Sequence, residues 1–189
     1  TRVLTLNEPP SQGDAAWAYN TMLAAGIIAE SLTEKTLADA LRGASASVDG
    51  LFGTGLGFGR RLAIDGGGAL AVHMLNASPV PTLALDIPSG IHADTGAILG
   101  VAVQAAHTIT FGALKRGLTQ EPGRAHAGTL HLGHLGFAAD ASSRATWLTY
   151  ASAALPKRPP SCHKGQSGRV GSIGGGQGRE GAAMLASRA

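Results

Sequence analysis

Short apolar runs alternate with helix-like segments along most of the chain. Apolar residues three or four positions apart are typical of one helix face, whereas a short continuous apolar run is typical of a buried strand. Strands are accordingly predicted at Arg2–Leu6, Ala46–Phe52, Thr82–Ile87, Thr108–Gly112 and Thr129–Leu132. Helices are predicted at Asp14–Ala25, with Asp14 as its N-cap, at Thr33–Arg42, capped by Thr33, and at Arg60–Leu75, whose middle is weakened by Gly66–Gly68. This alternation predicts an α/β fold whose parallel sheet is covered on both faces.

The pattern changes in the second half of the chain. Helical segments become rare after His107, which predicts a mixed or antiparallel sheet edge. Residues 138–160 are rich in proline and interrupt the alternation, so we expect a domain boundary there. A new strand at Arg169–Ile173 and a helix from Gly181 follow. We therefore predict one domain over residues 1–150 and a linker with the start of a second domain over 151–189.

Composition narrows the classes of function. Hydrophobic residues make up 44% and charged residues 14% of the 189 residues, as in globular proteins. The net charge of +3 comes from scattered basic residues, so we expect small anionic ligands and no nucleic-acid partner. Cys162 is the only cysteine, which excludes an internal disulfide and predicts a reducing compartment, the cytoplasm. No apolar run reaches the ~18 residues of a membrane span. The chain lacks an initial Met and stops within a predicted helix, so we expect truncation at both ends.

Two acidic residues stand at the carboxyl ends of predicted strands. Asp49 lies near the end of one strand and Asp86 near the end of the next, and ligands of parallel sheets bind beyond such ends. With hydroxyl and carbonyl oxygens nearby, two carboxylates can bind a hard cation, or one can act as a general acid or base. Asp86 can instead cap its turn through an Asx hydrogen bond, with Ser89 as an ordinary turn residue.

Glycine-rich segments follow two predicted strands. Gly53–Gly59 precedes a predicted helix, so its N–H groups and the helix N-terminus favour an anion such as phosphate. A plain tight turn is the alternative, because the spacing differs from G-x-G-x-x-G. Gly176–Gly181 does match that nucleotide-binding fingerprint, but the acid expected about 20 residues further on falls beyond the last residue. The match alone is a weak signal.

Other polar residues give weaker signals. Lys115 follows a predicted strand and can reach a phosphate, although a solvated surface lysine is the more common situation. His126, His131 and His134 lie close in sequence, but residues 131 and 134 of one strand point to opposite faces. No cysteine or H-E-x-x-H pattern accompanies them, so we do not expect a metal site there.

Several motifs occur in the order found in a known family. They are VDGLFGTGL (48–56), LDIPSGIHADTG (85–96), HTITFGALKRGL (107–118) and GRAHAGTLHLGHLGF (123–137). This part of the chain resembles the NAD(P)H-hydrate epimerase domain of bifunctional NAD(P)H-hydrate repair enzymes. RPPSCHKGQSGRVGSIGGGQGREGAA (158–183) resembles the opening of their ADP-dependent dehydratase domain. The resemblance covers nearly the whole chain.

The resemblance implies a fold and an activity. The fold is a three-layer, Rossmann-like, mostly parallel sheet, followed by the first strand and helix of a ribokinase-like domain. The activity is repair of NADHX and NADPHX, the hydrated forms of NADH and NADPH. The epimerase interconverts the R and S hydrates, and the dehydratase removes water from the S form with ADP or ATP. We also expect a homo-oligomer.

The resemblance further implies roles for individual residues. Asp49 and Ser89 would help to hold a potassium ion, K+. Asp86 would contact the hydrate and transfer a proton. The remaining substrate contacts would come from Gly53, Thr54, Gly55, Leu56, Gly57, Phe58, Gly59 and, in the second domain, Ala182.

Two other functions remain open at this point. An ordinary NAD-dependent oxidoreductase would use the fingerprint at Gly176–Gly181 and would transfer a hydride to a second substrate. A related non-catalytic module would bind nucleotide without turnover. The three hypotheses differ in whether Asp86 is needed for chemistry.

Overall fold

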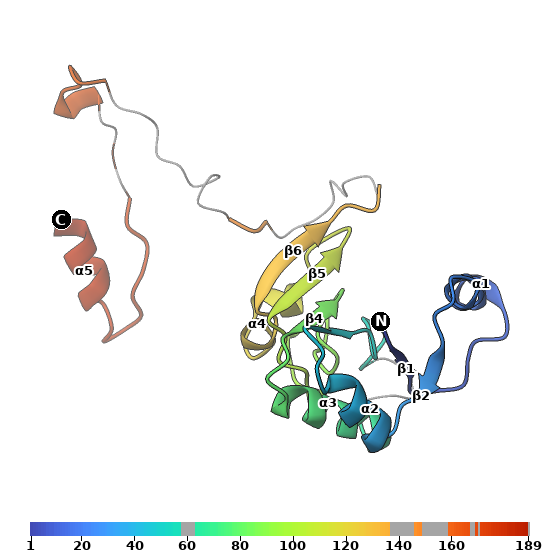
Figure 1. Cartoon of the computed structure of the whole chain (residues 1–189). Helices are drawn as coiled ribbons and strands as arrows, with labels where there is room; N and C mark the ends of the chain where they lie inside the picture. Colours follow the sequence, from blue (N-terminus) through green and yellow to red (C-terminus); the bar gives the residue numbers. More distant parts are fainter. Residues whose placement is uncertain (58–62, 137–145, 149–158, 167–168, 170, 189) are drawn as a thin grey trace. The chain divides into compact units, whose positions relative to one another are not determined.

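The computed structural model describes residues 1–57, 63–136, 146–148, 159–166, 169 and 171–188 (Figure 1). The chain forms two units, 1–139 and 140–189. All strands of the described residues lie in the first unit. The first unit therefore contains the α/β architecture, and the assignment of residues 151–189 to a dehydratase domain stays a prediction.

The main sheet of the first unit has four parallel strands in the order β3-β4-β5-β6. These strands are β3 Ser47–Asp49, β4 Thr82–Leu85, β5 His107–Phe111 and β6 Thr129–Gly133. A second, two-stranded parallel sheet pairs β1 Val3–Thr5 with β2 Ala29–Ser31. The predicted α/β class with a Rossmann-like parallel sheet is confirmed.

The edge strand β6 corrects one expectation. It pairs with β5 in parallel, and not in the antiparallel sense that the scarcity of helices predicted. The connection between the two strands holds only a short 3₁₀ helix, η1 Arg116–Thr119, and a short helix, α4 Gly123–His126. The chain thus returns to the amino ends of the strands through a short crossover that contains no long helix.

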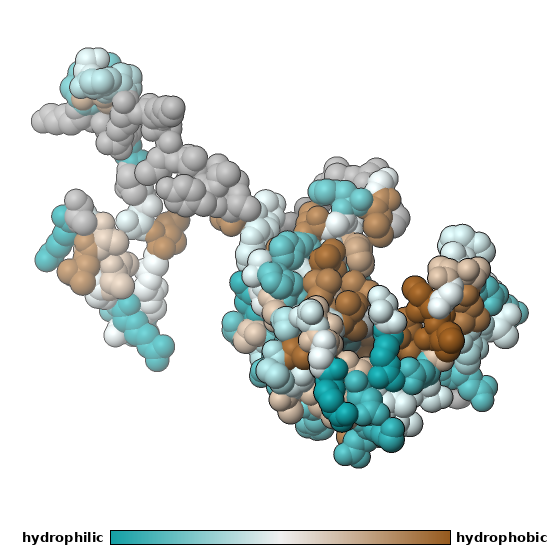
Figure 2. Space-filling view, viewed as in Figure 1, coloured by the Kyte–Doolittle hydropathy of each residue, from teal (hydrophilic) through white to brown (hydrophobic). Residues whose placement is uncertain are grey.

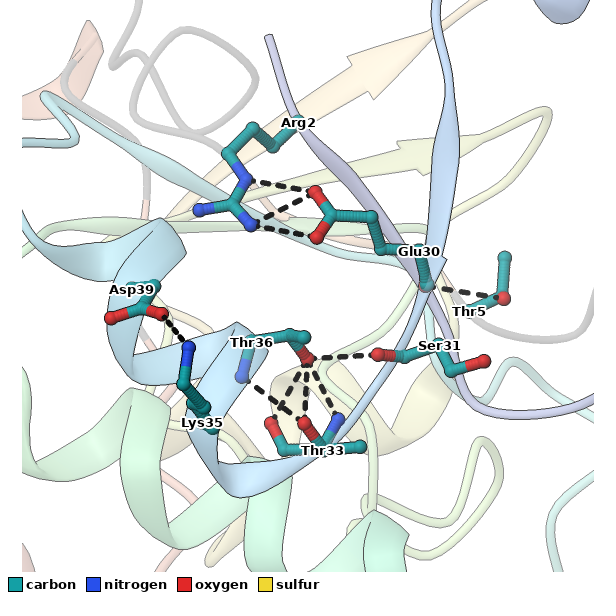
Figure 3. Close-up of polar contacts among 8 residues, drawn as sticks. All are labelled: Arg2, Thr5, Glu30, Ser31, Thr33, Lys35, Thr36 and Asp39. Carbon is teal, nitrogen blue, oxygen red and sulfur yellow. Dashed lines mark hydrogen bonds and ion pairs between the residues drawn. The ribbon is translucent and has the colours of Figure 1, made fainter.

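Helix α2, Glu34–Leu41, begins where its cap predicts. The Thr33 side chain accepts a hydrogen bond from Thr36 N at 3.1 Å, and Thr33 N donates to Thr36 Oγ1 at 2.9 Å (Figure 3). This reciprocal capping box satisfies N–H groups that a helix start leaves free. Nearby, Arg2 binds the Glu30 carboxylate in a forked ion pair that joins β1 to β2 (Figure 3). Helix α1, Gly13–Ala24, also forms as predicted, although Gln12 is its N-cap and not Asp14.

Helix α3, Gly66–Ala77, starts later than the predicted Arg60. Residues 63–65 are not helical, and residues 60–62 lie outside the described residues. A Cβ atom on Gly68 would lie 2.9 Å from Phe52 Cε2, closer than carbon atoms tolerate. Glycine at the helix start therefore lets α3 approach the end of β3, and the glycines do not interrupt the middle of a longer helix.

Two apolar clusters form the core among the described residues of the first unit. One joins α3 residues Val72 and Leu75 to Leu56, Ile64 and Val103. The other gathers side chains from the segment after β4 and from the crossover to β6: Ile87, Ile91, Ala93, Ala102, Leu118 and Ala127. Both clusters contain residues that follow a strand end. The core therefore fixes the loops at that edge of the sheet.

Side chains alternate between the two faces of β4. Thr82 and Ala84 are buried, whereas Leu85 is 38% exposed and Val48 of neighbouring β3 is 61% exposed. Figure 2 shows apolar side chains gathered on the visible face of the sheet region. One face of the sheet thus holds the buried polar and small residues, and the other presents apolar side chains.

The second unit contains η2 Lys164–Gln166 and α5 Gly181–Arg188. The predicted helix from Gly181 is therefore present. The predicted strand at Arg169–Ile173 is not formed in its described residues, 169 and 171–173. A strand needs a neighbouring strand for its backbone hydrogen bonds, and the described residues of this unit hold no other strand. Among the described residues of the chain, no helix has the length and apolar character to cross a membrane.

Candidate active site

The sheet brings the ends of β3 and β4 together at one edge. Asp49 is the last residue of β3, and Asp86 directly follows the last residue of β4. The two strands are parallel neighbours, with Asp49 in register with Ala84. Both carboxylates therefore lie at the carboxyl edge of the sheet, where the sequence predicted a ligand site.

Asp49 and Ser89 form one closely bonded pair. Ser89 Oγ donates to Asp49 Oδ1 at 2.6 Å, and Ser89 N donates to Asp49 Oδ2 at 2.8 Å. Leu51 N also donates to Oδ1 at 3.2 Å, which is an Asx turn. The turn that was considered for Asp86 thus occurs at Asp49. The fold thus brings together Asp49 and Ser89, which are 40 residues apart in the sequence.

The environment of Asp49 is nearly closed to solvent, with 1% of the residue exposed. Burial raises the pKa of its carboxyl, while hydrogen bonds from Ser89 and Leu51 act in the opposite direction. All its donors in the described part of the chain are neutral. A buried carboxylate without a cationic partner is costly, so this site suits a bound cation. Carboxylate and hydroxyl oxygens are ligands of hard cations, so Asp49 and Ser89 fit the potassium site that the resemblance implied.

Asp86 has an unusual backbone conformation. Its φ of 69° lies in the left-handed region, which costs a non-glycine residue about 1–2 kcal/mol. Asp86 N still donates to Ile109 O at 2.7 Å, so the ladder with β5 continues through this residue. Strained backbone of this kind gathers at functional sites, because the surrounding structure must hold it in place.

Three donors from the β5 side meet one oxygen of the Asp86 carboxylate. Phe111 N donates to Oδ1 at 3.1 Å, Thr110 Oγ1 donates to it at 3.3 Å, and Lys115 Nζ forms an ion pair with it. Lys115 Nζ also donates to Phe111 O at 2.9 Å. The side chains of Asp86 and Lys115 are 27% and 20% exposed, so the pair faces a partly solvated edge.

The sequence pattern did not place Lys115 beside Asp86. A solvated surface lysine was the more common expectation, but its ammonium is bonded to Asp86 and Phe111. The available signal was its position just after the strand β5, since neighbouring parallel strands end at the same edge. That signal needs the strand order, which the sequence pattern alone does not give.

The glycine-rich loop after β3 lies against the segment after β4. Gly53, Thr54 and Gly55 are exposed, while the Leu56 side chain is buried. Gly57 has a φ of +90°, and a Cβ atom there would lie 2.7 Å from His92 Cδ2. Phe58 and Gly59 lie outside the described residues.

This loop does not run directly into a helix. Residues 63–65 separate it from the start of α3 at Gly66, so the expected help from a helix N-terminus falls elsewhere. The start of the loop instead lies next to Asp49 and Ser89, because Phe52 N donates to Ser89 Oγ at 2.9 Å. The exposed backbone of Gly53, Thr54 and Gly55 remains the feature that suits a phosphate.

The other candidates lie elsewhere. Ala182 is exposed in α5 of the second unit, and its place in the site stays a prediction. His126 Nδ1 contacts Val103 O at 3.0 Å, and His131 Nε2 contacts His107 Nδ1 at 3.1 Å. Within the described residues, no three histidine, cysteine or acidic side chains are grouped for a metal. The fingerprint Gly176–Gly181 is not preceded by a strand in its described surroundings.

A parallel α/β domain with polar groups at the carboxyl edge of its sheet belongs to the class that binds ligands there. The chain belongs to the family of the YjeF-related protein N-terminus, whose model matches residues 1–117. That range contains Asp49, Asp86 and every residue described above that donates a hydrogen bond to either carboxylate.

Relatives support this membership. The chain is 36% identical over 175 residues to the bifunctional NAD(P)H-hydrate repair enzyme Nnr of Thermofilum pendens, which covers 90% of this chain and 33% of that protein. It is 40% identical over 147 residues to the enzyme of the same name from Escherichia coli, covering 75% and 28%. It is 44% identical over 93 residues to the NAD(P)H-hydrate epimerase of Levilactobacillus brevis, covering 49% and 41%. The chain thus spans about a third of the length of the bifunctional relatives it matches.

Proposed function

We propose that the first unit is an NAD(P)H-hydrate epimerase that acts on NADHX and NADPHX in the repair of damaged nicotinamide nucleotides. The observation that carries this proposal is the Asp86 carboxylate, held at the ligand edge of the sheet in a family whose relatives are named for this reaction. An oxidoreductase is not favoured, because the relatives are repair enzymes and epimerases.

The proposed chemistry is acid–base opening of the hydrate. Inverting a hydroxyl-bearing carbon requires that one of its bonds breaks and re-forms on the opposite face. During opening a base takes the hydroxyl proton, the oxygen forms a carbonyl, and the bond from that carbon to the ring nitrogen breaks, leaving its electron pair on nitrogen. Closure on the opposite face of the carbonyl reverses each step and returns the proton to the oxygen. Asp86 is our candidate for this proton transfer, since it is partly exposed and its position is fixed by the end of β5.

We further propose that Asp49 and Ser89 hold a potassium ion. The support is the buried carboxylate, whose donors in the described residues are all neutral. When bound, the ion would supply positive charge to the Asp49 carboxylate at the carboxyl edge of the sheet. The loop of Gly53, Thr54, Gly55, Leu56, Gly57, Phe58 and Gly59 would contact the phosphates of the substrate. Within it, Leu56 is buried and its N–H donates to Gly53 O at 3.2 Å, so the exposed residues before it would make the closest contacts.

Residues 151–189 are proposed to open the ADP-dependent dehydratase domain, which would use ADP or ATP and include Ala182. A match over 90% of this 189-residue chain must extend beyond residue 139, so it reaches into the second unit. The relative that it matches is named as bifunctional. A homo-oligomer in the cytoplasm remains our expectation for the assembled protein.

The test is an epimerase assay on the full-length protein. Purified R-NADPHX is incubated with the protein, and the S epimer is followed by chromatography with and without potassium. We expect Asp86→Asn to lower the rate by about 10²–10⁴-fold, the usual contribution of a general acid or base. Asparagine accepts the left-handed conformation and keeps an acceptor for Lys115, so the fold should persist.

Asp94→Asn is the matched control, because Asp94 is an exposed acid eight positions further along the same segment. Its rate should equal that of the unaltered protein. Full activity in Asp86→Asn would remove Asp86 from the mechanism. Nucleotide binding without turnover in the unaltered protein would favour the non-catalytic module.

A further inference from the structure

The chain brings Lys115 back to the end of β4 by a short turn. Strand β5 ends at Phe111, and Gly112 N donates to Gly133 O of β6 at 3.0 Å. Ala113 N then donates to Phe111 O at 2.8 Å, which closes the turn. Lys115 follows and directs its Nζ to Phe111 O and to Asp86. The ammonium is therefore fixed by a backbone carbonyl as well as by the carboxylate.

The contacts of Asp86 are one-sided. Its Oδ1 receives Thr110 Oγ1, Phe111 N and Lys115 Nζ. No residue of the described part of the chain donates to its Oδ2. A carboxylate with one oxygen bound by three donors cannot rotate freely, so the other oxygen has a defined direction. Since the side chain is 27% exposed, that oxygen can be reached by a ligand.

We propose that Lys115 is a positioning residue for Asp86, binding Oδ1 so that Oδ2 takes the proton of the substrate. This inference rests on the proposed epimerase function, whose reaction needs a base of fixed geometry. The ammonium also balances the charge of the carboxylate at a partly buried edge. Lys115 thus acts on the reaction through Asp86 and does not touch the reacting carbon.

The competing role for Lys115 is direct binding of a substrate phosphate. A phosphate-binding lysine contributes to substrate affinity, so its loss raises KM and leaves kcat nearly unchanged. A positioning lysine affects the reactive geometry, so its loss lowers kcat and leaves KM nearly unchanged. The two roles therefore predict opposite kinetic changes for the same substitution.

The test compares Lys115→Met, Lys115→Arg and Lys115→Ala with Lys35→Met in the full-length protein. Lys35 is the matched control, because it is an 87% exposed lysine that also pairs with an aspartate, Asp39. We expect Lys115→Met to lower kcat for R-NADPHX by about 10–100-fold, the size expected for losing a charged hydrogen bond. Lys115→Arg should recover part of this loss, and added methylammonium should partly restore Lys115→Ala. Lys35→Met should match the unaltered protein.

A rise in KM with unchanged kcat in Lys115→Met would overturn the proposal in favour of phosphate binding. Absence of any rescue by arginine or methylammonium would also overturn it. If Lys115→Met does not fold, Lys115→Arg still decides, since a lowered kcat at unchanged KM supports positioning and the reverse contradicts it.

Failure of the proposed function gives a different result. In that case the unaltered protein does not convert R-NADPHX at all. The pairing itself is then tested by urea unfolding of Asp86→Gly, which removes the carboxylate and accepts the φ of 69°, of Lys115→Met and of the double variant. Non-additive effects on the unfolding free energy would support the pairing of Lys115 with Asp86, and additive effects would overturn it.

Discussion

Two carboxylates at the ends of neighbouring strands are held in opposite ways. Asp49 is buried and receives only neutral donors in the described structure, from Ser89 and Leu51. Asp86 is partly exposed and receives the ammonium of Lys115 on one oxygen. The same residue type at the same edge of one sheet thus has two different environments.

The difference teaches how environment assigns a role to a carboxylate. A buried carboxylate bonded through both oxygens has little access to a substrate proton, but it can hold a cation. A partly exposed carboxylate with one engaged oxygen can exchange a proton through the other. Pairs of titratable groups with contrasting surroundings are a common basis for such a division of roles. We therefore expect substitutions at Asp49 to change stability and substitutions at Asp86 to change activity.

The largest effect on stability is expected from Asp49→Ala. This change leaves the buried Ser89 N and the partly buried Leu51 N without their acceptor, at a cost of about 1–3 kcal/mol for a fully buried donor. We expect the free energy of unfolding in potassium-free buffer to fall by about 3 kcal/mol, measured by urea denaturation and circular dichroism. Asp86→Asn serves as the comparison and should lose less than about 1 kcal/mol, because its acceptor for Lys115 is kept. Equal losses in the two variants would break the contrast between the carboxylates.

A smaller effect tests whether the two regions are linked. Gly57 belongs to the loop after the strand of Asp49, and it contacts His92 in the segment after the strand of Asp86. Gly57→Ala places a Cβ atom 2.7 Å from the imidazole at a φ of +90°, so we expect a loss of about 1–3 kcal/mol and a higher KM. Gly43→Ala is the control, since Gly43 lies outside this loop and also has a positive φ, of +82°, but no atom lies within 4 Å of its added Cβ. The same urea and epimerase assays apply, and equal behaviour of the two variants would contradict the contact.

The sequence predicted the features that depend on local pattern. Apolar runs located the ends of β3 and β4, and parallel geometry then placed Asp49 and Asp86 at one edge. The cap of α2 was also predicted, because Thr33 bonds to a residue three positions away. In each case the deciding interactions lie within a few residues or follow from strand direction alone.

The features that sequence reasoning missed depend on packing between distant segments. The ion pair of Lys115 with Asp86 requires β4 and β5 to be neighbours, and no local pattern gives the strand order. The close packing of Gly68, in the first turn of α3, against Phe52 also joins separate segments, and the apolar pattern along α3 does not show it. Strand β2, which was not predicted, has only three residues and depends on pairing with β1.

The smallest expected effect concerns the pH dependence of stability. Burial raises the pKa of Asp49 above its ordinary value of 3.8. Above pH 3.8 the unfolded chain loses the Asp49 proton first, so the folded state holds more protons and the unfolding free energy falls as pH rises. The contribution of Asp49 is fully present below pH 3.8 and is lost as pH passes the raised pKa. A pKa that is one unit higher in the folded than in the unfolded chain corresponds to about 1.4 kcal/mol of unfolding free energy.

Urea unfolding at several pH values between about 3.5 and about 7 measures this contribution. In potassium-free buffer, the unfolding free energy of the unaltered protein minus that of Asp49→Asn should fall as pH rises, because only the unaltered protein titrates at Asp49. Added potassium should reduce the fall, since a cation beside the carboxylate favours its ionised form. Asp94→Asn, which removes an exposed acid, should show the pH dependence of the unaltered protein.

A difference between the unaltered protein and Asp49→Asn that rises with pH in the absence of potassium would mean that the hydrogen bonds from Ser89 and Leu51 outweigh burial. Asp49 would then need no cation, and the contrast with Asp86 would lose its physical basis.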